Sequence, residues 1–206
     1  MSVMPQILIA TSNAGKLQDF SAAGRAQGVN IEAVPGLSSL PSVAEDAPTF
    51  EGNAQKKAEH YSRFIPGAVV LADDSGLEVD ALGGAPGVRS ARYAAEASGA
   101  GNASDVANNV RLLAELKDVP DERRTARFVC VIAAGRDGRR VGTFQGEAQG
   151  LILRAPRGSG GFGYDPLFFS PRLGKTFAEL TAEQKAKVSH RGKAFGEFLR
   201  WYEAGV

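Results

Sequence analysis

The strongest constraint on the fold is a strand, turn, helix and strand pattern near the start of the chain. Ile7 to Ala10 is a short apolar run typical of a buried strand, and Leu17 and Phe20 then lie on one side of a helical pattern. The apolar residues from Ile31 to Val34 predict a second strand. This order predicts a βαβ opening of the kind from which α/β sheets are built.

The middle of the chain continues the alternation of helix and strand. The pattern predicts a helix over Phe50 to Phe64 and a buried strand over Ala68 to Ala72 that ends at Asp73-Asp74. Between Ser75 and Gly101 the chain is rich in Gly and Ala, and we expect it to be mostly irregular. Ser104 is a favourable N-cap for a further helix. That helix is indicated by apolar residues at helical spacing: Val106, Val110, Leu113 and Leu116.

The last part of the chain predicts a hairpin and two helices. Thr125 to Ala134 and Val141 to Leu153 are expected to be strands joined by the turn Gly135-Arg136-Asp137-Gly138. Thr181 to Gln184 forms a capping box that opens a helix. The final helix is expected to bury Phe195, Phe198, Leu199 and Tyr202. No repeat or linker divides the chain, so we expect a single domain over residues 1–206 with a mixed sheet.

Composition excludes several classes of protein. The 206 residues include 24 Lys and Arg against 23 Asp and Glu, and this balance argues against a protein that coats nucleic acid. A hydrophobic content of 43% argues against a disordered chain. The 25 Gly residues favour an enzyme with functional loops. Cys130 is the only cysteine, which excludes an internal disulfide, and we expect it to be a buried strand residue.

The sequence also predicts a location. No apolar stretch approaches the roughly 20 residues that span a bilayer. Met1 to Gln6 lacks a basic region and leads directly into a strand, so we do not expect a signal peptide. The expected compartment is the cytoplasm, with no membrane partner.

The first candidate for chemistry is the turn Thr11-Ser12-Asn13-Ala14-Gly15-Lys16, between a strand and a helix. Backbone N–H groups at a helix N-terminus favour an anion, and Lys16 adds a positive charge. The P-loop pattern is not met, because Ala10 and Leu17 replace its first Gly and its Ser or Thr. The turn is therefore either a phosphate loop of another type or an ordinary polar turn.

The second candidate is an acidic segment from Asp73 to Asp80. Four carboxylates lie within it, and no Lys or Arg occurs from Phe64 to Val88. Carboxylates crowded at the edge of a sheet repel one another, and a hard divalent cation relieves that repulsion. Glu45-Asp46, in an earlier loop, can supply another carboxylate. A solvated acidic loop is the alternative.

Two further segments complete the set. Gly158 to Pro166 contains G-x-G-x-x-G, but Asp165-Pro166 stands where a helix should begin, so it is not a dinucleotide fingerprint. Its Phe162 and Tyr164 can stack on a base, or they can cap the core. Lys185 to Lys193 holds four cations and one of two histidines, and we expect it at a helix end. The other histidine, His60, is expected to be a surface residue.

Taken in order, these segments resemble the inosine triphosphate pyrophosphatase family, the XTP/dITP diphosphatases. The resemblance covers nearly the whole chain and rests on the following motifs: Thr11-x-Asn13-x-x-Lys16, Ala72-Asp-Asp-Ser-Gly-Leu-x-Val-Asp80, Gly83-Gly-Ala-Pro-Gly87 with Ser90-Ala-Arg-Tyr93, Gly160-Gly-Phe-Gly-Tyr-Asp-Pro166 and Ser189-His-Arg-Gly192. It implies Mg²⁺-dependent hydrolysis of ITP, dITP and XTP to the monophosphate and pyrophosphate. It also implies an elongated mixed central sheet flanked by helices, two lobes with the active-site cleft between them, and a homodimer.

The resemblance assigns roles to individual positions. Asp74 would be the catalytic carboxylate and, with Glu45, a metal ligand. The substrate would be held by Thr11, Ser12, Asn13, Ala14, Gly15, Lys16, Ser75, Phe162, Gly163, Tyr164, Asp165, Lys185, His190 and Arg191. Ser12 departs from the Gly or Asn common in the family.

Physical chemistry agrees with this assignment. Hydrolysis at phosphorus needs the phosphate charge neutralised and a water deprotonated. Hydrogen-bond donors of His190 or Arg191 would bind the 6-oxo group of a deaminated purine. In adenine the same donors would meet the 6-amino group, which is itself a donor. Two alternatives remain: a related pyrophosphatase for methylated or pyrimidine nucleotides, and a nucleotide- or RNA-binding module without hydrolysis.

Overall fold

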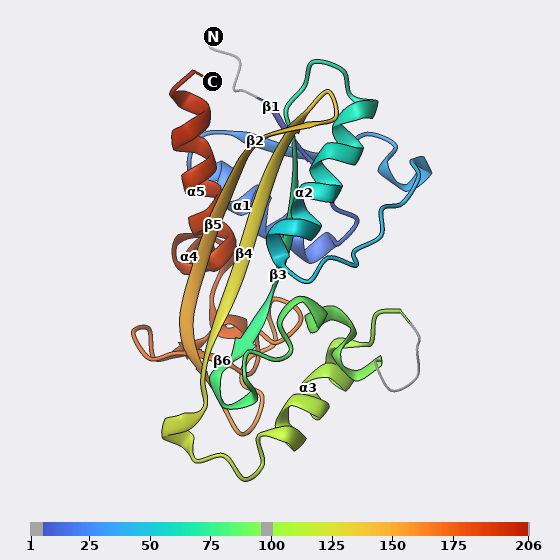
Figure 1. The fold of residues 1–206 in the computed structure, drawn as a ribbon. Coiled ribbons are helices and arrows are strands. Elements are labelled where there is room, and N and C mark those ends of the chain that lie inside the picture. The colour runs from blue at the N-terminus through green and yellow to red at the C-terminus, as the bar shows by residue number, and fades with distance from the viewer. Residues whose placement is uncertain (1–5, 96–100, 206) are drawn as a thin grey trace. The chain divides into compact units, whose positions relative to one another are not determined.

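The computed structural model describes residues 6–95 and 101–205 (Figure 1). The chain divides into two compact units, each assembled from distant segments. Unit 1 comprises Met1–Asp74, Cys130–Glu147 and Ala182–Val206, and unit 2 comprises Ser75–Val129 and Ala148–Thr181. Most of Met1 to Gln6, and part of the Gly- and Ala-rich stretch up to Gly101, lie outside the described residues.

The predicted mixed sheet is confirmed. Its seven strands are β1 (Gln6–Ile9), β2 (Asn30–Ala33), β3 (Val70–Val79), β4 (Thr125–Arg136), β5 (Arg139–Ile152), β6 (Phe168–Ser170) and β7 (Lys175–Thr176). They are hydrogen-bonded in the order β2-β1-β3-β4-β5-β6-β7. The pairs of β1 with β2 and β3 are parallel, whereas β5–β6 and β6–β7 are antiparallel. The three long strands β3, β4 and β5 each pass from one unit to the other.

Unit 1 contains the predicted βαβ opening. Helix α1 (Ala14–Arg25) joins β1 to β2, and it packs on one face of the sheet together with α4 (Ala182–Val188) and α5 (His190–Glu203), while α2 (Phe50–Tyr61) lies on the other face (Figure 1). The core beneath α1 and α5 includes Phe20, Ile9, Cys130 and Phe198, none of them exposed to solvent. Burial of these apolar side chains is the main favourable contribution to folding. Cys130 is thus buried in a strand, as expected.

Strand β3 is longer than the sequence indicates. It continues through Asp73 and Asp74 to Val79 instead of ending at Ala72. The residues after it form the short 3-10 helices Asp80–Leu82 and Gly87–Ala95, so the prediction of a mostly irregular stretch is wrong for this part. Polar side chains often mark the end of a buried strand because they need polar partners. Here Asp73 and Asp74 have such partners inside the protein, and the strand continues past them.

Helix α3 (Asp105–Glu115) belongs to unit 2 and begins at the predicted N-cap, Ser104, whose side chain accepts a hydrogen bond from the Ala107 N–H. The predicted apolar stripe is only partly buried, because Val106 and Val110 are 72% and 62% exposed. The core-facing residues are Leu112 and Leu116, which are fully buried. Asn108 is buried beside them through side-chain hydrogen bonds, and this polar anchor sets the helix rotation that turns the two valines outward.

A buried arginine holds the end of α3 in unit 2. Arg124 is 2% exposed and donates hydrogen bonds to the Leu116, Ile152 and Leu153 carbonyl oxygens, at 2.6, 2.7 and 3.1 Å. Leu116 is the C-cap residue of α3, so Arg124 satisfies one of the helix carbonyls that lack an intrahelical partner.

The hairpin and the C-terminal helices are present as predicted, but β4 runs to Arg136 and β5 starts at Arg139, so the turn is shorter than the predicted Gly135 to Gly138. Asp137 and Gly138 both have positive φ, 51° and 80°, as a two-residue hairpin turn requires. Phe195, Phe198 and Leu199 of α5 are buried, whereas Tyr202 is only partly buried. Over the described stretches of the chain, no helix has the length and apolar character needed to cross a bilayer.

Candidate active site

The turn between β1 and α1 forms the first wall of the candidate site. Asn13 is the N-cap of α1, and its Oδ1 accepts a hydrogen bond of 2.9 Å from the Lys16 N–H. The Asn13 N–H is in turn 3.2 Å from the Thr11 Oγ1. These side chains fix the turn while Ser12, Asn13 and Ala14 stay exposed at the positive end of the helix dipole. The turn therefore has the geometry of an anion site.

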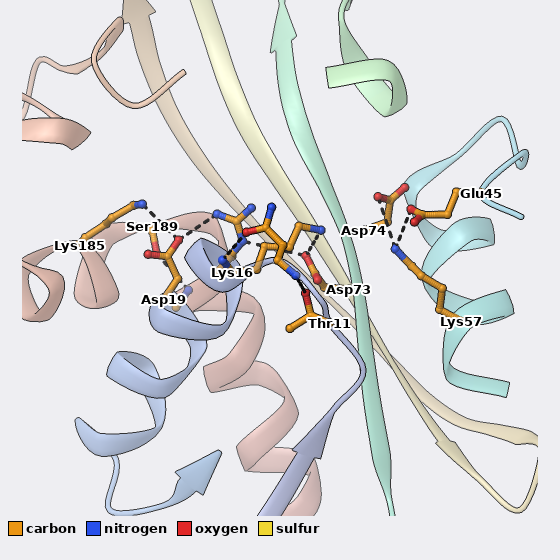
Figure 2. A network of polar contacts seen from close by, with 12 residues as sticks. Thr11, Lys16, Asp19, Glu45, Lys57, Asp73, Asp74, Lys185 and Ser189 are labelled. Carbon is orange, nitrogen blue, oxygen red and sulfur yellow. Dashed lines mark hydrogen bonds and ion pairs between the residues drawn. The ribbon is translucent and has the colours of Figure 1, made fainter. Parts of the chain in front are cut away.

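Asp73 and Asp74 project from opposite faces of the sheet. Because successive side chains of a strand alternate, two adjacent carboxylates in β3 cannot share one environment. Figure 2 shows Asp73 directed toward Lys16 and Asp74 directed toward Lys57 and Glu45, on the two sides of β3. The two carboxylates therefore have different roles.

Asp73 is held by cations. Its Oδ2 lies 3.0 Å from the Lys16 Nζ and 4.0 Å from the Arg191 Nε. Burial alone would raise the pKa of the Asp73 carboxyl, but the charges of Lys16, Arg191 and Lys57 outweigh burial and hold this pKa below its ordinary value. The cations thus favour the ionised form of Asp73, which orients Lys16 at the end of the turn.

Asp74 has the opposite electrostatic character. Its Oδ2 accepts a hydrogen bond of 3.0 Å from the Asn53 Nδ2, and its Oδ1 is 3.9 Å from the Lys57 Nζ. Burial raises the pKa of the Asp74 carboxyl above its ordinary value, although Lys57, Lys16 and Asn53 favour the ionised form. A carboxylate with a raised pKa is a stronger base, which suits proton abstraction.

Lys57 and Glu45 complete this side of the site. Glu45 lies in the exposed loop before α2, and its Oε2 is 2.9 Å from the Lys57 Nζ. Burial alone would lower the pKa of the Lys57 ammonium, but Asp73, Asp74 and Glu45 together raise it above its ordinary value. Two carboxylates thus converge on one cationic group in this part of unit 1.

This donor set fits a magnesium ion. Nowhere in the described part of the chain do three or more His, Cys, Asp or Glu side chains gather as a metal cage. Mg²⁺ is usually held by one or two carboxylates together with waters and substrate phosphates, which matches the pair Glu45 and Asp74. The placement of the Lys57 ammonium between them shows that the site favours positive charge.

The predicted block of four carboxylates does not exist as one site. Glu78 and Asp80 belong to unit 2, where Glu78 pairs with Arg127 at 2.7 Å and Asp80 accepts a hydrogen bond of 2.6 Å from the Thr125 Oγ1. Asp73 and Asp74 belong to unit 1 and lie near Lys16 and Lys57, which are distant in sequence. The absence of nearby cations in the sequence was therefore misleading.

The basic segment lies at the junction of α4 and α5, as expected. Lys185 and Arg191 both contact the Asp19 Oδ2, at 3.1 and 2.9 Å, so Asp19 of α1 holds both cations (Figure 2 shows Lys185 and Asp19). The N-cap of α5 is Ser189, and a Cβ at Gly192 would stand 1.7 Å from the Ala186 carbonyl oxygen. Only glycine therefore permits this close approach of the two helices.

His190 is fully buried at the start of α5. Burial, with the charges of Arg191 and Lys185, lowers the pKa of the His190 imidazole well below its ordinary value. The neutral ring carries one N–H donor and one acceptor nitrogen. His60 is more than a surface residue, because its Nε2 is 2.8 Å from the Pro41 carbonyl oxygen in the loop that leads to Glu45.

Unit 2 contains Ser75 and the aromatic loop. The Asp165 Oδ2 accepts a hydrogen bond of 3.0 Å from the Phe162 N–H, and the Tyr164 hydroxyl donates to the Ser90 carbonyl oxygen at 2.8 Å. Tyr164 and Asp165 are buried, whereas Phe162 is only partly covered. Within unit 2, Tyr164 and Asp165 therefore shape the loop, and Phe162 is its accessible aromatic ring.

Three residues of unit 1 were missed by sequence reasoning: Asp19, Asn53 and Lys57. A signal existed for the last two, because they share the buried face of α2 with Ala54 and Ala58. A polar side chain within the apolar stripe of a helix needs a partner inside the protein. Asp19 carries no comparable signal, since its partners lie far away in sequence.

Fold and site together define an α/β protein whose carboxylates and lysines suit an anionic ligand carried with a cation. The model of the Ham1 family matches residues 7–201. The chain belongs to the Ham1 family.

Individual relatives support this membership. The dITP/XTP pyrophosphatase of Geobacter sulfurreducens is 51% identical over 201 residues, which cover 96% of this chain and 98% of that protein. The Ham1 protein of Staphylococcus aureus has a similar structure, with a TM-score of 0.80 and 39% identity over 98% of this chain and 100% of its own. The HAM1 protein of Coxiella burnetii gives a TM-score of 0.81 and 37% identity with the same coverage.

Proposed function

We propose that this protein is a Mg²⁺-dependent pyrophosphohydrolase that converts ITP, dITP and XTP to the monophosphate and pyrophosphate, and so removes deaminated purines from the nucleotide pool. The observation that best supports this proposal is the position of Asp74, a buried carboxylate with a raised pKa, beside Lys57 and Glu45. The names of the relatives, dITP/XTP pyrophosphatases, support the substrate class.

The residues of unit 1 divide the reaction between them. The amides of the Thr11 to Lys16 turn and the Lys16 ammonium bind phosphate oxygens and offset their charge. Asp74 takes a proton from the attacking water, which forms a new P–O bond as the bond between the α- and β-phosphates breaks and pyrophosphate leaves. Asn53 orients the Asp74 carboxylate through its amide N–H.

Magnesium belongs to the same proposal. Glu45 and Asp74 would hold the ion, which supplies charge neutralisation at the phosphates when bound. The Lys57 ammonium, now shared by these two carboxylates, would be freed to face a phosphate oxygen.

Base selection is assigned to the other predicted contacts. Phe162 offers a ring for stacking, and neutral His190 can donate one hydrogen bond to a 6-oxo group. Arg191 is engaged by Asp19 and Asp73, so its contribution to a base would need one of the remaining guanidinium N–H groups. The proposal also includes a cytosolic location and a homodimer.

A single assay tests the reaction. The purified protein is incubated with ITP, dITP, XTP, GTP, ATP and a methylated pyrimidine triphosphate in MgCl₂, and the products are separated by ion exchange. We expect monophosphate and pyrophosphate from the deaminated purines at rates well above those for GTP and ATP. Release of orthophosphate, preference for another nucleotide, or binding without turnover would refute the proposal.

The metal is tested separately. Isothermal titration with MgCl₂ in the presence of IMP and pyrophosphate should show binding, and Glu45→Gln should weaken it. An unchanged Mg²⁺ affinity in this variant would remove Glu45 from the metal site.

A further inference from the structure

Two side chains of α3 form hydrogen bonds with one residue of the aromatic loop of unit 2, Gly163. The Gly163 N–H donates a hydrogen bond of 2.7 Å to the Asp105 Oδ2, and the Gly163 carbonyl oxygen accepts one of 3.0 Å from the Asn109 Nδ2. Asp105 and Asn109 are one helical turn apart and therefore lie on the same face of α3. Both polar groups of one loop residue are thus bound by the same helix face.

These side chains are not needed to begin the helix. The N-cap of α3 is Ser104, whose Oγ accepts the hydrogen bond from the Ala107 N–H at 3.1 Å. The Asp105 carboxylate, although favourable near the helix N-terminus, directs its Oδ2 at the loop. Asn109 likewise uses its amide N–H on the loop and not on its own helix.

The next residue of the loop is tied to the same helix by a second route. The Tyr164 hydroxyl donates to the Ser90 carbonyl oxygen at 2.8 Å. The 3-10 segment around Ser90 is in turn fixed to α3 by Asn108, whose Nδ2 donates to the Ala91 carbonyl oxygen at 3.2 Å and whose Oδ1 accepts from the Ala94 N–H at 2.8 Å. Three parts of unit 2, the 3-10 segment, α3 and the aromatic loop, are therefore joined to one another by hydrogen bonds.

The hydrogen bonds from α3 act on the backbone conformation of the loop at Gly163. Its φ is +61°, a left-handed conformation that glycine adopts without the strain of a side chain. Such freedom leaves the course of the loop to its hydrogen bonds: Asp105 and Asn109 bind the peptide groups of Gly163, while Asp165 binds the Phe162 N–H. Phe162 immediately precedes Gly163, and the orientation of its ring follows from the orientation of that peptide.

We propose that Asp105 and Asn109 are positioning residues that set the height and tilt of Phe162 and thereby control binding and selection of the purine base. This inference rests on the proposed function, because it takes Phe162 as the ring against which the base stacks. Both side chains bind the loop that carries Phe162, so we expect their effect to be confined to ligands that carry a base.

The test compares two probes on the same variants. The Kd of IMP, which contains the base, and that of pyrophosphate, which lacks it, are measured by titration calorimetry for the wild type, Asn109→Ala and Asp105→Ala. We expect the Kd of IMP to rise by about tenfold, the scale of one lost hydrogen bond, with the Kd of pyrophosphate unchanged within about twofold. The KM for ITP should rise similarly while kcat changes little, and discrimination against GTP should fall.

Matched variants separate positioning from general damage. Asp105→Asn keeps an oxygen that can accept the Gly163 N–H and should restore IMP binding to near the wild-type value. Val110→Ala, an exposed residue adjacent to Asn109, should alter neither probe. Unchanged IMP affinity in Asn109→Ala, or equal weakening of both probes, would overturn the inference. A wild-type protein that fails to hydrolyse ITP would instead refute the proposed function.

Discussion

At the scale of single residues, the main result is the division of labour between Asp73 and Asp74. The sequence predicts that carboxylates, the Thr11 to Lys16 turn and Glu45 belong to one kind of chemistry. It does not reveal which carboxylate is ionised most easily, because that depends on the sheet face each one occupies and on cations from α1, α2 and α5. Roles that depend on long-range partners need the structure.

Asp74→Asn should remove activity and increase stability. The Asp74 pKa is raised in the folded state, so the folded protein binds this proton more tightly than the unfolded chain. The free energy of unfolding therefore falls as pH rises from the Asp74 pKa of the unfolded chain to the raised pKa of the folded protein, and it remains lower at neutral pH. Asn is uncharged and does not cause this loss of stability. We expect kcat to fall by about 10²–10⁴-fold and Tm to rise.

The measurements for Asp74→Asn are steady-state kinetics with ITP and thermal unfolding at pH 7.5. Binding of ITP by calorimetry is the control that the fold and the phosphate turn are intact. Activity close to that of the wild type would show that another group acts as the base.

At the scale of secondary structure elements, helix α2 carries the loop that holds Glu45. Asn53 accepts a hydrogen bond of 2.9 Å from the Ala47 N–H and donates to Asp74, while Lys56, Lys57 and His60 contact Asp46, Glu45 and Pro41 from neighbouring turns. One face of a single helix therefore fixes the loop and the Asp74 carboxylate together.

Asn53→Ala tests this arrangement. It removes the acceptor for Ala47 and the donor to Asp74 in a residue that is 1% exposed, so we expect a loss of about 1–3 kcal/mol in the free energy of unfolding and a lower kcat. Gln55→Ala, on the same helix but away from the site, should lower neither by a comparable amount. Urea unfolding and ITP kinetics provide the comparison, and equal effects of the two variants would contradict the role of Asn53.

The rotation of α3 is the clearest case at this scale in which the apolar pattern predicted the wrong buried face. The spacing of Val106, Val110, Leu113 and Leu116 predicts a helix correctly, but the buried polar anchor Asn108 turns Val106 and Val110 outward. An apolar periodicity identifies a helix more reliably than it identifies the face that is buried. The end of β3 was mispredicted for a related reason, because polar residues with internal partners continue a strand.

Two substitutions in α3 distinguish the faces. Leu112→Ala should cost about 2–5 kcal/mol because it leaves a cavity in the core, whereas Val110→Lys should change stability by less than about 0.5 kcal/mol. Both values are obtained from urea unfolding followed by circular dichroism. A large loss in Val110→Lys would mean that this side chain is buried in solution.

At the scale of the whole molecule, the family resemblance implies two lobes, but no local pattern in the sequence marks the division into the two units. Each unit joins segments far apart along the chain, and β3, β4 and β5 contribute to both. The strands themselves were largely predictable from apolar runs, since period and turn signals are local. Which unit each part of a strand joins depends on packing that no local pattern encodes.

Stability should fall on acidification because of His190. Its pKa is lowered in the folded state, so below the ordinary value of about 6.5 the unfolded chain binds a proton that the folded protein does not. Stability is thus complete above this value and declines below it, by at most about 1.4 kcal/mol per pH unit for one proton.

Thermal unfolding of the wild type and of His190→Gln between pH 7.5 and 5.5 measures this effect. The variant starts from a lower Tm because the ring is buried, but its Tm should change less over this range. Parallel pH profiles for the two proteins would show that other groups control the dependence.

The alternation of side chains along β3 has a consequence for how this chain can vary. Insertion or deletion of one residue in the first half of the strand would exchange the sheet faces of Asp73 and Asp74, so that neither carboxylate would keep its own partners. No substitution nearby could repair that exchange, because the cations come from helices on different faces. We therefore expect a change of length in the first half of β3 to abolish function even where the fold survives, so that the register of a single strand protects the proposed chemistry.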